Sequence, residues 1–288
     1  MHIEFIQKII DKIRHKVPLN SYIMELGTKI LTYKKFSKNI DTIILGSSHA
    51  QLGYRAEYNE FNLGLSFQDL YCSYNLYKKL NNKNIKNVIL FYSVFSPGAQ
   101  TIKSKFADTM TVYKVIAGFD YQDINIAKEK KINDLEQGYK HQFNKLKKTF
   151  IFNSDYRGNE VSYITCFKPP IAADRAKPHF KNNQRHNNQT KYIEYLQSET
   201  AKNNQNLYIV IPPATEDYKK ALPQSKELYK ELFNVKGLNI FNYYDEHFAN
   251  EEFEDWDHLN LKGAVRLTKM IRDNISEKQL CVKSNTSI

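Results

Sequence analysis

The chain has 288 residues and a formal net charge of +11, and 41% of its residues are hydrophobic. This length and composition suit a folded protein with one large domain, and no stretch reaches the roughly 18–20 consecutive apolar residues of a membrane-spanning helix. The three cysteines show no C-x-x-C spacing, which argues against a zinc knuckle or a disulfide framework and favours a reducing compartment.

The positive charge is spread along the whole chain, with lysines interleaved among Asn, Asp and Glu. It is compatible with a solvated basic surface or with an anionic partner such as a polyanionic glycan, a nucleotide-bearing cofactor or a membrane surface. Nucleic acid is not expected, because no known binding motif accompanies the charge. Polar residues at Glu4, Gln7 and Asp11 interrupt any apolar leader sequence, so we expect a cytoplasmic protein.

Two helices are expected before the main domain. Residues 1–17 carry isoleucines at helical spacing with basic residues on the remaining surface, and Pro18 ends this pattern. This amphipathic helix is expected to pack on the main domain, or to dock on a partner or peripherally on the inner membrane. A second helix is expected over Tyr22–Phe36, so residues 1–38 form a predicted helical segment that precedes a domain over 39–288.

Strands and helices alternate in the main domain. Five short apolar runs predict strands at Thr42–Leu45, Glu60–Leu63, Asn87–Tyr92, Asn206–Ile211 and Leu238–Phe241. Helical patterns follow at Asp69–Leu80, Lys191–Lys202, Asp217–Phe233 and Leu261–Ile275. Nearly continuous apolar strands that alternate with helices indicate an α/β fold, with a parallel sheet covered by helices on both faces.

The alternation stops over residues 97–187. A candidate helix at Asp134–Phe150, several prolines and a polar run over residues 181–188 occupy this stretch. About 90 residues are too many for a plain loop. We therefore expect an inserted cap or lid over the carboxyl edge of the sheet, where α/β proteins place their sites. Its content of Tyr, Asn, Gln, Lys and His suits sugar recognition better than an acyl-chain tunnel.

Two segments near the ends of the chain carry the residue types for acyl transfer. Ser48 follows the first strand at a Gly-Ser-Ser turn, where its hydroxyl would act as a nucleophile beside backbone N–H groups, or simply cap a helix. Asp255 precedes His258 by one helical turn, so its carboxylate can fix the tautomer of an imidazole that accepts the serine proton. Asp257 is a competing partner, in a less natural geometry because it adjoins His258.

With these residues identified, the chain resembles the SGNH (GDSL-type) hydrolase superfamily. The resemblance rests on Gly46-Ser47-Ser48 after an apolar strand and on Asp255-x-x-His258-Leu259-Asn260-x-x-Gly263 near the C-terminus. It covers roughly residues 40–95 and 190–275.

The resemblance implies a flavodoxin-like three-layer α/β/α sandwich with N-terminal helices and a large insertion added. By motif position, it implies that Ser48 is the nucleophile, His258 the base and Asp255 its partner. Ser47 stands where the family usually has an Asp with a supporting role.

The predicted oxyanion hole departs from the family pattern. The resemblance assigns it the backbone N–H groups of Ser48 and Phe67, although the family has a glycine in place of Phe67. The third block, which normally supplies an Asn side chain, is Tyr92–Ser96 here, so Ser93, Ser96 or a cap residue would have to substitute. Loss of one oxyanion donor costs about 100- to 1000-fold in rate.

Further polar residues are candidates for substrate contact. His49 directly follows the nucleophile. Arg185 and His186, with the nearby His179, could line a polyanion or cofactor site in the insertion, although a solvated loop is the structure expected there. Neither a phosphate-binding glycine loop nor a metal-ligand cluster can be identified in the sequence. We therefore expect no metal and no tightly bound cofactor, with acetyl-CoA or another acyl donor as a co-substrate.

The family resemblance implies an ester hydrolase or an O-acyltransferase, with carbohydrate as a common substrate. We expect O-acetyl transfer to, or removal from, a surface polysaccharide or its precursor, neutral or anionic, through an acyl-Ser48 intermediate. A lipid or thioester hydrolase is one alternative. A non-catalytic glycan-binding or scaffold protein of a polysaccharide assembly is another, because the third block lacks its Asn. The sequence does not predict the oligomeric state.

Overall fold

The computed structural model describes residues 20–100, 108–119, 126–163, 171–185, 189–223 and 225–285. The predicted helix over residues 1–17 lies outside these ranges. The chain divides into two compact units, one formed by Met1–Lys35 with Gln100–Asp155 and the other by Phe36–Ala99 with Tyr156–Ile288. The predicted insertion is therefore shared between the two units, and its role as a cap stays a prediction.

The described part of the first unit is helical. It contains α2 (Ser21–Phe36), α5 (Asp108–Ala117) and α6 (Ile126–Thr149), and α5 packs against α6. Asn20, just before α2, donates hydrogen bonds to Gln142 Oε1 (3.0 Å) and to the Tyr139 hydroxyl (2.7 Å) of α6. The helix expected over Tyr22–Phe36 is present, α6 begins earlier than predicted, and α5 was not predicted.

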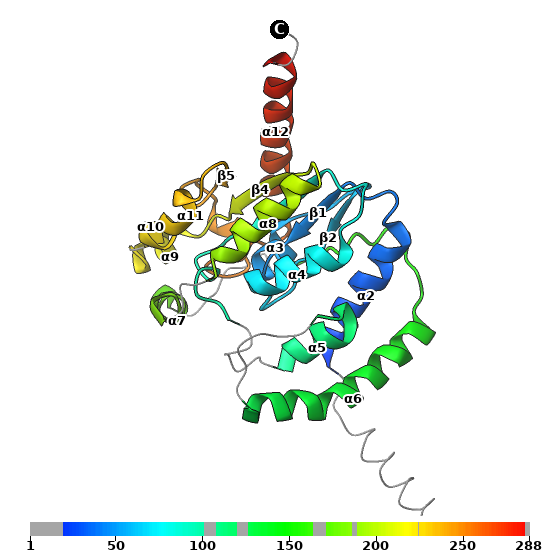
Figure 1. Cartoon of the computed structure of the whole chain (residues 1–288). Coiled ribbons are helices and arrows are strands. Elements are labelled where there is room, and N and C mark those ends of the chain that lie inside the picture. The colour runs from blue at the N-terminus through cyan, green and yellow to red at the C-terminus, as the bar shows by residue number, and fades with distance from the viewer. Residues whose placement is uncertain are drawn as a thin grey trace, which may run out of the picture. The chain divides into compact units, whose positions relative to one another are not determined.

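The second unit is built on a five-stranded parallel sheet (Figure 1). Its strands are β1 (Thr42–Leu45), β2 (Glu60–Asn62), β3 (Asn87–Phe91), β4 (Asn206–Ile211) and β5 (Asn239–Asn242). The prediction of an α/β fold with a parallel sheet is confirmed. The spatial order β2-β1-β3-β4-β5 is that of flavodoxin-like doubly wound sheets, in which the order reverses next to β1.

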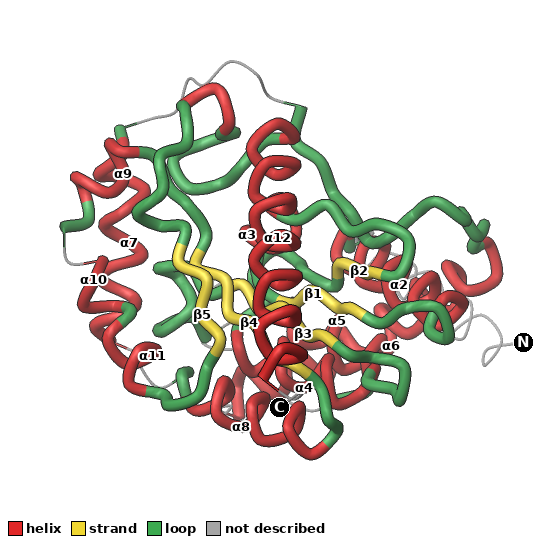
Figure 2. Tube along the Cα trace, turned by 90° about the horizontal axis from the view of Figure 1, so that it is seen from above, coloured by secondary structure: helices red, strands yellow, loops and turns green. Residues whose placement is uncertain are grey.

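Helices cover both faces of this sheet, as in a three-layer α/β/α sandwich (Figure 2). On one face, α4 (Leu70–Leu80) packs against α8 (Lys191–Lys202). On the other face, α3 (Ser48–Gly53) packs against α12 (Leu261–Asn285). Both helices of this second pair share one apolar core with the strands, which contains Ile44, Ala50, Ile89, Val210, Leu267 and Ile271.

Several helices differ from their predicted bounds. The prediction of a single helix over residues 217–233 is wrong. The chain forms three short helices there: α9 (Glu216–Ala221), α10 (Ser225–Leu228) and α11 (Lys230–Asn234). Pro223 explains the break after α9, because proline has no N–H for a continuing helix. The last helix, α12, extends ten residues beyond its predicted end at Ile275.

The polar run expected to be a loop is partly helical. Residues 172–185 form α7 (Ala172–Arg185), which contains Pro178 and begins far from any predicted element. A short 3-10 helix, η2 (Asn250–Glu252), precedes the segment that carries His258. Within the described ranges, no helix has the combined length and hydropathy that crossing a bilayer requires.

Asn62, at the end of β2, fixes the position of α3. Its fully buried side chain donates from Nδ2 to the carbonyls of Ala50 (2.8 Å) and Tyr54 (3.0 Å), and Oδ1 accepts from the Gly64 N–H (2.9 Å). A Cβ on Gly64 would lie only 2.8 Å from both Ala50 Cβ and the Gln51 nitrogen. The loop after β2 is therefore pressed against the first turns of α3.

We predict that Asn62→Ala destabilises the second unit by about 3 kcal/mol, because it removes three buried hydrogen bonds to the backbone groups of Ala50, Tyr54 and Gly64. Urea unfolding followed by the fluorescence of Trp256, the single tryptophan, measures this unit directly. The control Asn206→Ala removes only an exposed hydrogen bond to Asn87 and should change stability by less than about 0.5 kcal/mol. Equal losses in the two variants would contradict this role of Asn62.

Candidate active site

A sharp turn after β1 presents Ser48. Gly46 has φ +135°, and a Cβ there would lie 3.0 Å from Phe91 Cβ and 3.1 Å from Ala50 Cβ, so a glycine is required. Ser47 is extended (φ −77°, ψ −160°), and α3 begins at Ser48. Ser47 and the residue after Ser48 are buried, whereas Ser48 itself is partly exposed. Of the two adjacent serines, Ser48 is therefore the accessible one.

The three predicted catalytic side chains lie in one hydrogen-bonded series. Ser48 Oγ is 2.7 Å from His258 Nε2, and His258 Nδ1 is 2.9 Å from Asp255 Oδ2. The other oxygen of Asp255 accepts from the backbone N–H groups of His258 (2.8 Å) and Asp257 (3.0 Å), which holds the carboxylate in place. With Nδ1–H donated to Asp255, the Nε2 lone pair faces the Ser48 hydroxyl.

The segment that carries His258 is anchored to the start of α12. Asn260 Oδ1 accepts from the N–H groups of Lys262 (3.0 Å) and Gly263 (3.3 Å) and so caps the helix. The Asn260 amide donates to the Glu251 carbonyl (2.8 Å). A Cβ on Gly263 would collide with the Glu252 carbonyl oxygen, so this glycine allows η2 to lie against α12.

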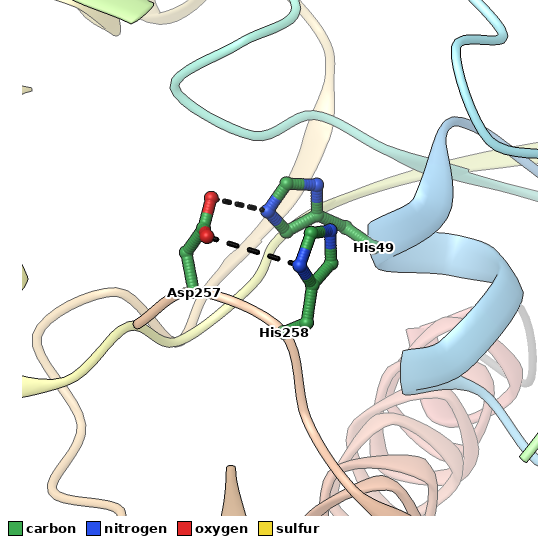
Figure 3. A group of neighbouring side chains, drawn as sticks. All are labelled: His49, Asp257 and His258. Atoms are coloured by element: carbon green, nitrogen blue, oxygen red, sulfur yellow. Dashed lines mark hydrogen bonds and ion pairs between the residues drawn. The ribbon is translucent and has the colours of Figure 1, made fainter. Parts of the chain in front are cut away.

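Asp257 is a second, fully enclosed carboxylate beside His258 (Figure 3). Its Oδ2 is 3.1 Å from His49 Nε2, and its Oδ1 accepts from Arg175 Nε at 2.9 Å. Asp257 Oδ1 is 3.9 Å from His258 Nδ1, a full ångström farther than Asp255 Oδ2. The distances favour Asp255 over Asp257 as the partner of the imidazole.

His49 joins Asp257 to Ser47 in a series parallel to the first. Its Nδ1 is 3.2 Å from Ser47 Oγ, and its ring lies 4.6 Å from the His258 ring, centroid to centroid. Both nitrogens of this buried ring therefore face protein groups. The substrate-binding role expected for His49 stays a prediction, and the two protein contacts make it a neighbour of the first series.

Two side chains of α7 reach the site, and sequence analysis did not place either of them there. The Arg175 NH2 nitrogen lies 3.2 Å from His258 Nδ1 and 3.9 Å from Asp255 Oδ2. His179, one helical turn later, has Nδ1 2.6 Å from the Tyr218 hydroxyl and 3.8 Å from Asp257 Oδ2. The prediction of a solvated loop around His179 is wrong, because this residue lies on α7. Arg175 and His179 are four residues apart, a spacing that places two side chains on the same face of a helix. The sequence could have indicated this pair only if α7 had been predicted as a helix.

The remaining candidates for substrate contact stay predictions. Arg185 is the last residue of α7, and His186 lies outside the described residues.

The candidate oxyanion residues lie in two turns. Phe67 has φ +61°, a left-handed conformation that is uncommon for a residue other than glycine. Ser93 is buried after β3, where its N–H donates to Ser96 Oγ (3.0 Å) and its Oγ accepts from the Phe95 N–H (3.3 Å). The Ser93 N–H and one lone pair of Ser96 Oγ are thus engaged locally. An oxyanion role for Ser48, Phe67 and Ser93 stays a prediction.

The buried charges shift the pKa values of the site in opposite directions. Burial lowers the pKa of His258, but Asp257 and Asp255 outweigh it and raise this pKa above its usual value. Burial raises the pKa of Asp257, but His258, His49 and Arg175 outweigh it and hold this pKa well below its usual range. Burial dominates at His49, whose pKa is lowered, and at His179, whose pKa is lowered to about 4.

Three donor side chains gather closely enough to be considered as metal ligands, although no such cluster was visible in the sequence. Donor atoms of His49, Asp257 and His258 lie within 4.8 Å of one another. The Arg175 guanidinium contacts Asp257 and His258 Nδ1, and that same nitrogen faces Asp255. A metal ion would have to displace a positive charge that the protein itself supplies, so this donor set fits a hydrogen-bonded network better than a metal centre.

Comparison with known proteins adds no family assignment. No protein-family model matches the chain, and no curated protein matches it significantly. The functional argument therefore depends on the geometry of the site.

The lowered pKa of His179 predicts a loss of stability in acid. The unfolded chain binds this proton near pH 6.5 and the folded one near pH 4, so stability falls by up to about 1.4 kcal/mol per pH unit as the pH drops through this interval. His179→Gln should reduce this slope, as measured by urea unfolding at a series of pH values with Trp256 fluorescence. An unchanged slope in the variant would contradict the assignment.

Proposed function

We propose that this protein is a serine-dependent acyl-ester enzyme of the SGNH type, with Ser48 as nucleophile, His258 as base and Asp255 as its partner. One observation carries the proposal: Ser48 Oγ lies 2.7 Å from the nitrogen of a histidine 210 positions away, whose other nitrogen lies 2.9 Å from Asp255. The flavodoxin-like strand order and the location of Ser48 after the carboxyl end of β1 support the same assignment.

The chemistry follows from this series. Ser48 Oγ attacks the carbonyl carbon of the ester while its proton moves to His258 Nε2, and the Asp255 carboxylate stabilises the imidazolium that forms. The tetrahedral intermediate collapses when His258 returns the proton to the departing alcohol or thiol, which leaves an acyl-Ser48. Water or an acceptor hydroxyl, deprotonated by the same imidazole, then releases the acyl group.

The oxyanion would be held by the N–H of Ser48, at the first position of α3, and by the N–H of Phe67. The left-handed backbone at Phe67 supports this, because glycine, the residue at the matching family position, adopts that conformation readily. Ser93 is the candidate for a side-chain donor: its Oγ accepts one hydrogen bond, and among the described residues its own proton has no acceptor.

The proposed substrate is an O-acetylated carbohydrate or a carbohydrate acceptor, neutral or anionic, with acetyl-CoA or another activated ester as the acyl donor. This part of the proposal rests on the family resemblance and on the basic charge of the chain. A non-catalytic glycan-binding protein is the second candidate. It is favoured by the segment Tyr92–Ser96, which lacks the Asn of the family's third block.

We predict that Ser48→Ala lowers turnover of p-nitrophenyl acetate by at least about 1000-fold, because no hydroxyl remains beside His258. Ser47→Ala is the matched control: Ser47 is adjacent and buried but contacts His49 rather than His258, so this variant should still form an acyl-enzyme. Turnover that survives Ser48→Ala would contradict the nucleophile assignment. A wild-type protein that is folded but inert toward every ester would favour the binding candidate.

Product analysis separates the two reactions within the proposal. Incubation with acetyl-CoA and a panel of saccharides should give an acetylated saccharide whose formation requires Ser48, if the protein is a transferase. Release of acetate alone, whatever the acceptor, would indicate an esterase.

A further inference from the structure

His258 lies among three charged side chains. Asp255 Oδ2 is 2.9 Å from its Nδ1, Asp257 Oδ1 is 3.9 Å away, and the Arg175 NH2 nitrogen is 3.2 Å away. The Ser48 hydroxyl contacts the opposite nitrogen of the ring. Two negative charges and one positive charge therefore surround the imidazole that the proposed function uses as a base.

This arrangement poses a problem for catalysis. Each carboxylate near an imidazole favours its protonated form, and an opposite charge within about 4–6 Å changes a pKa by about 1–3. An imidazole that is already protonated at neutral pH cannot accept the Ser48 proton. Two carboxylates acting together on His258 would therefore tend to inactivate the base.

Arg175 counteracts the second carboxylate in two ways. Its Nε donates to Asp257 Oδ1, while His49 faces Oδ2, so both oxygens of Asp257 are engaged away from His258. Its NH2 nitrogen also faces His258 Nδ1. When Nδ1–H donates to Asp255, the 3.2 Å contact between these two nitrogens brings two donors together. This donor contact is the same in the neutral and the protonated ring, but the positive charge of Arg175 repels only the imidazolium and so disfavours protonation.

The other titratable groups that face His258 carry no compensating charge at neutral pH. His49 of α3 and His179 of α7 have lowered pKa values because they are buried. Tyr218 of α9 is also close to this cluster, and burial raises the pKa of its hydroxyl. The fixed charges around the base are thus Asp255, Asp257 and Arg175.

The position of Arg175 is fixed by the packing of α7. This helix packs against α9, where the His179 ring contacts the Tyr218 hydroxyl at 2.6 Å. His179 also packs edge-on against the Phe95 ring, 5.8 Å between centroids. Within the described part of the chain, the side-chain hydrogen bonds and ion pairs of Arg175 are with Asp255, Asp257 and His258, so its charge acts on this cluster.

We propose that Arg175 is a positioning residue that weakens proton binding by His258, because it neutralises Asp257 and places a positive charge beside the ring. This inference rests on the proposed function, in which His258 is the base. It implies that α7, which lies in the segment expected to be a cap, contributes a residue that acts on the proposed base.

The test compares Arg175→Gln, Arg175→Lys and Lys177→Gln by the pH dependence of kcat/KM for p-nitrophenyl acetate, whose acid limb reports the base of the free enzyme. Arg175→Gln should move this limb to higher pH by about 1, so that activity below the limb falls about tenfold while most of the plateau at high pH remains. Arg175→Lys keeps the charge and should restore most of the wild-type profile. Lys177→Gln removes an exposed charge from the same helix and should leave the profile unchanged.

A second variant tests the opposite sign. Asp257→Asn removes one of the two negative charges but leaves Arg175, so it should move the acid limb to lower pH. The inference is overturned if Arg175→Gln lowers the plateau without moving the limb, if Arg175→Lys fails to rescue it, or if Lys177→Gln moves it equally.

Titration of the His258 ring by NMR, in the full-length protein and its variants, gives the same comparison without turnover. If the wild type hydrolyses no ester, the proposed function fails, but the NMR pKa of His258 still has to rise in Arg175→Gln. If turnover requires Ser48 while the His258 pKa is equal in wild type and Arg175→Gln, the proposed function stands and the role of Arg175 is wrong.

Discussion

The packing of α3 against the start of α12 brings the two halves of the site together, because α3 begins at Ser48 and α12 begins just after His258. Gly53 is the last residue of α3. A Cβ added there would lie 3.9 Å from the side chains of Leu259 and Leu267, which is van der Waals distance. A helix of six residues has little stability of its own, so this apolar contact and the hydrogen bonds of Asn62 must hold it. The 2.7 Å contact between Ser48 and His258 depends on both.

Behind this contact lies a cluster of ionisable side chains, of which Asp257 is buried and Arg175 and Asp255 are partly exposed. Two carboxylates, one guanidinium and three imidazoles share a small volume, in which an unpaired charge would be costly. Every member has a partner of opposite charge or a hydrogen bond. The two aspartates contact different groups. Asp255 faces the imidazole, whereas Asp257, 97% buried, is held by Arg175 and His49.

The parts of the fold that could be predicted are those with a local signal. Strands buried on both faces are short continuous apolar runs, so β1 to β5 were found within a residue or two of their observed bounds. The Gly-Ser-Ser turn and the spacing of Asp255 and His258 were also local patterns, and the predicted hydrogen-bonded series follows from where parallel strands end. The break at Pro223 was missed because the apolar spacing on its two sides suggests one helix.

The remaining parts of the site depend on tertiary placement. Arg175 and His179 sit on a polar helix that contains a proline, and nothing in residues 172–185 indicates which element they face. Spacing favoured Asp255 over Asp257 as the partner of His258. It could not show what Asp257 contacts instead, because Arg175 and His49 are far from it in the chain. The left-handed backbone at Phe67 likewise comes from the surrounding loop, because the residue type argues against it.

The central claim is that the Ser48 hydroxyl is activated by His258. The most direct measurement is the reaction of the folded protein with a fluorophosphonate, which phosphonylates an activated serine, followed by peptide mass spectrometry. The account predicts one adduct per chain, on Ser48, and a labelling rate that falls by at least about 100-fold in His258→Ala. An adduct on Ser47 or elsewhere, or a rate at Ser48 that does not depend on His258, would contradict it.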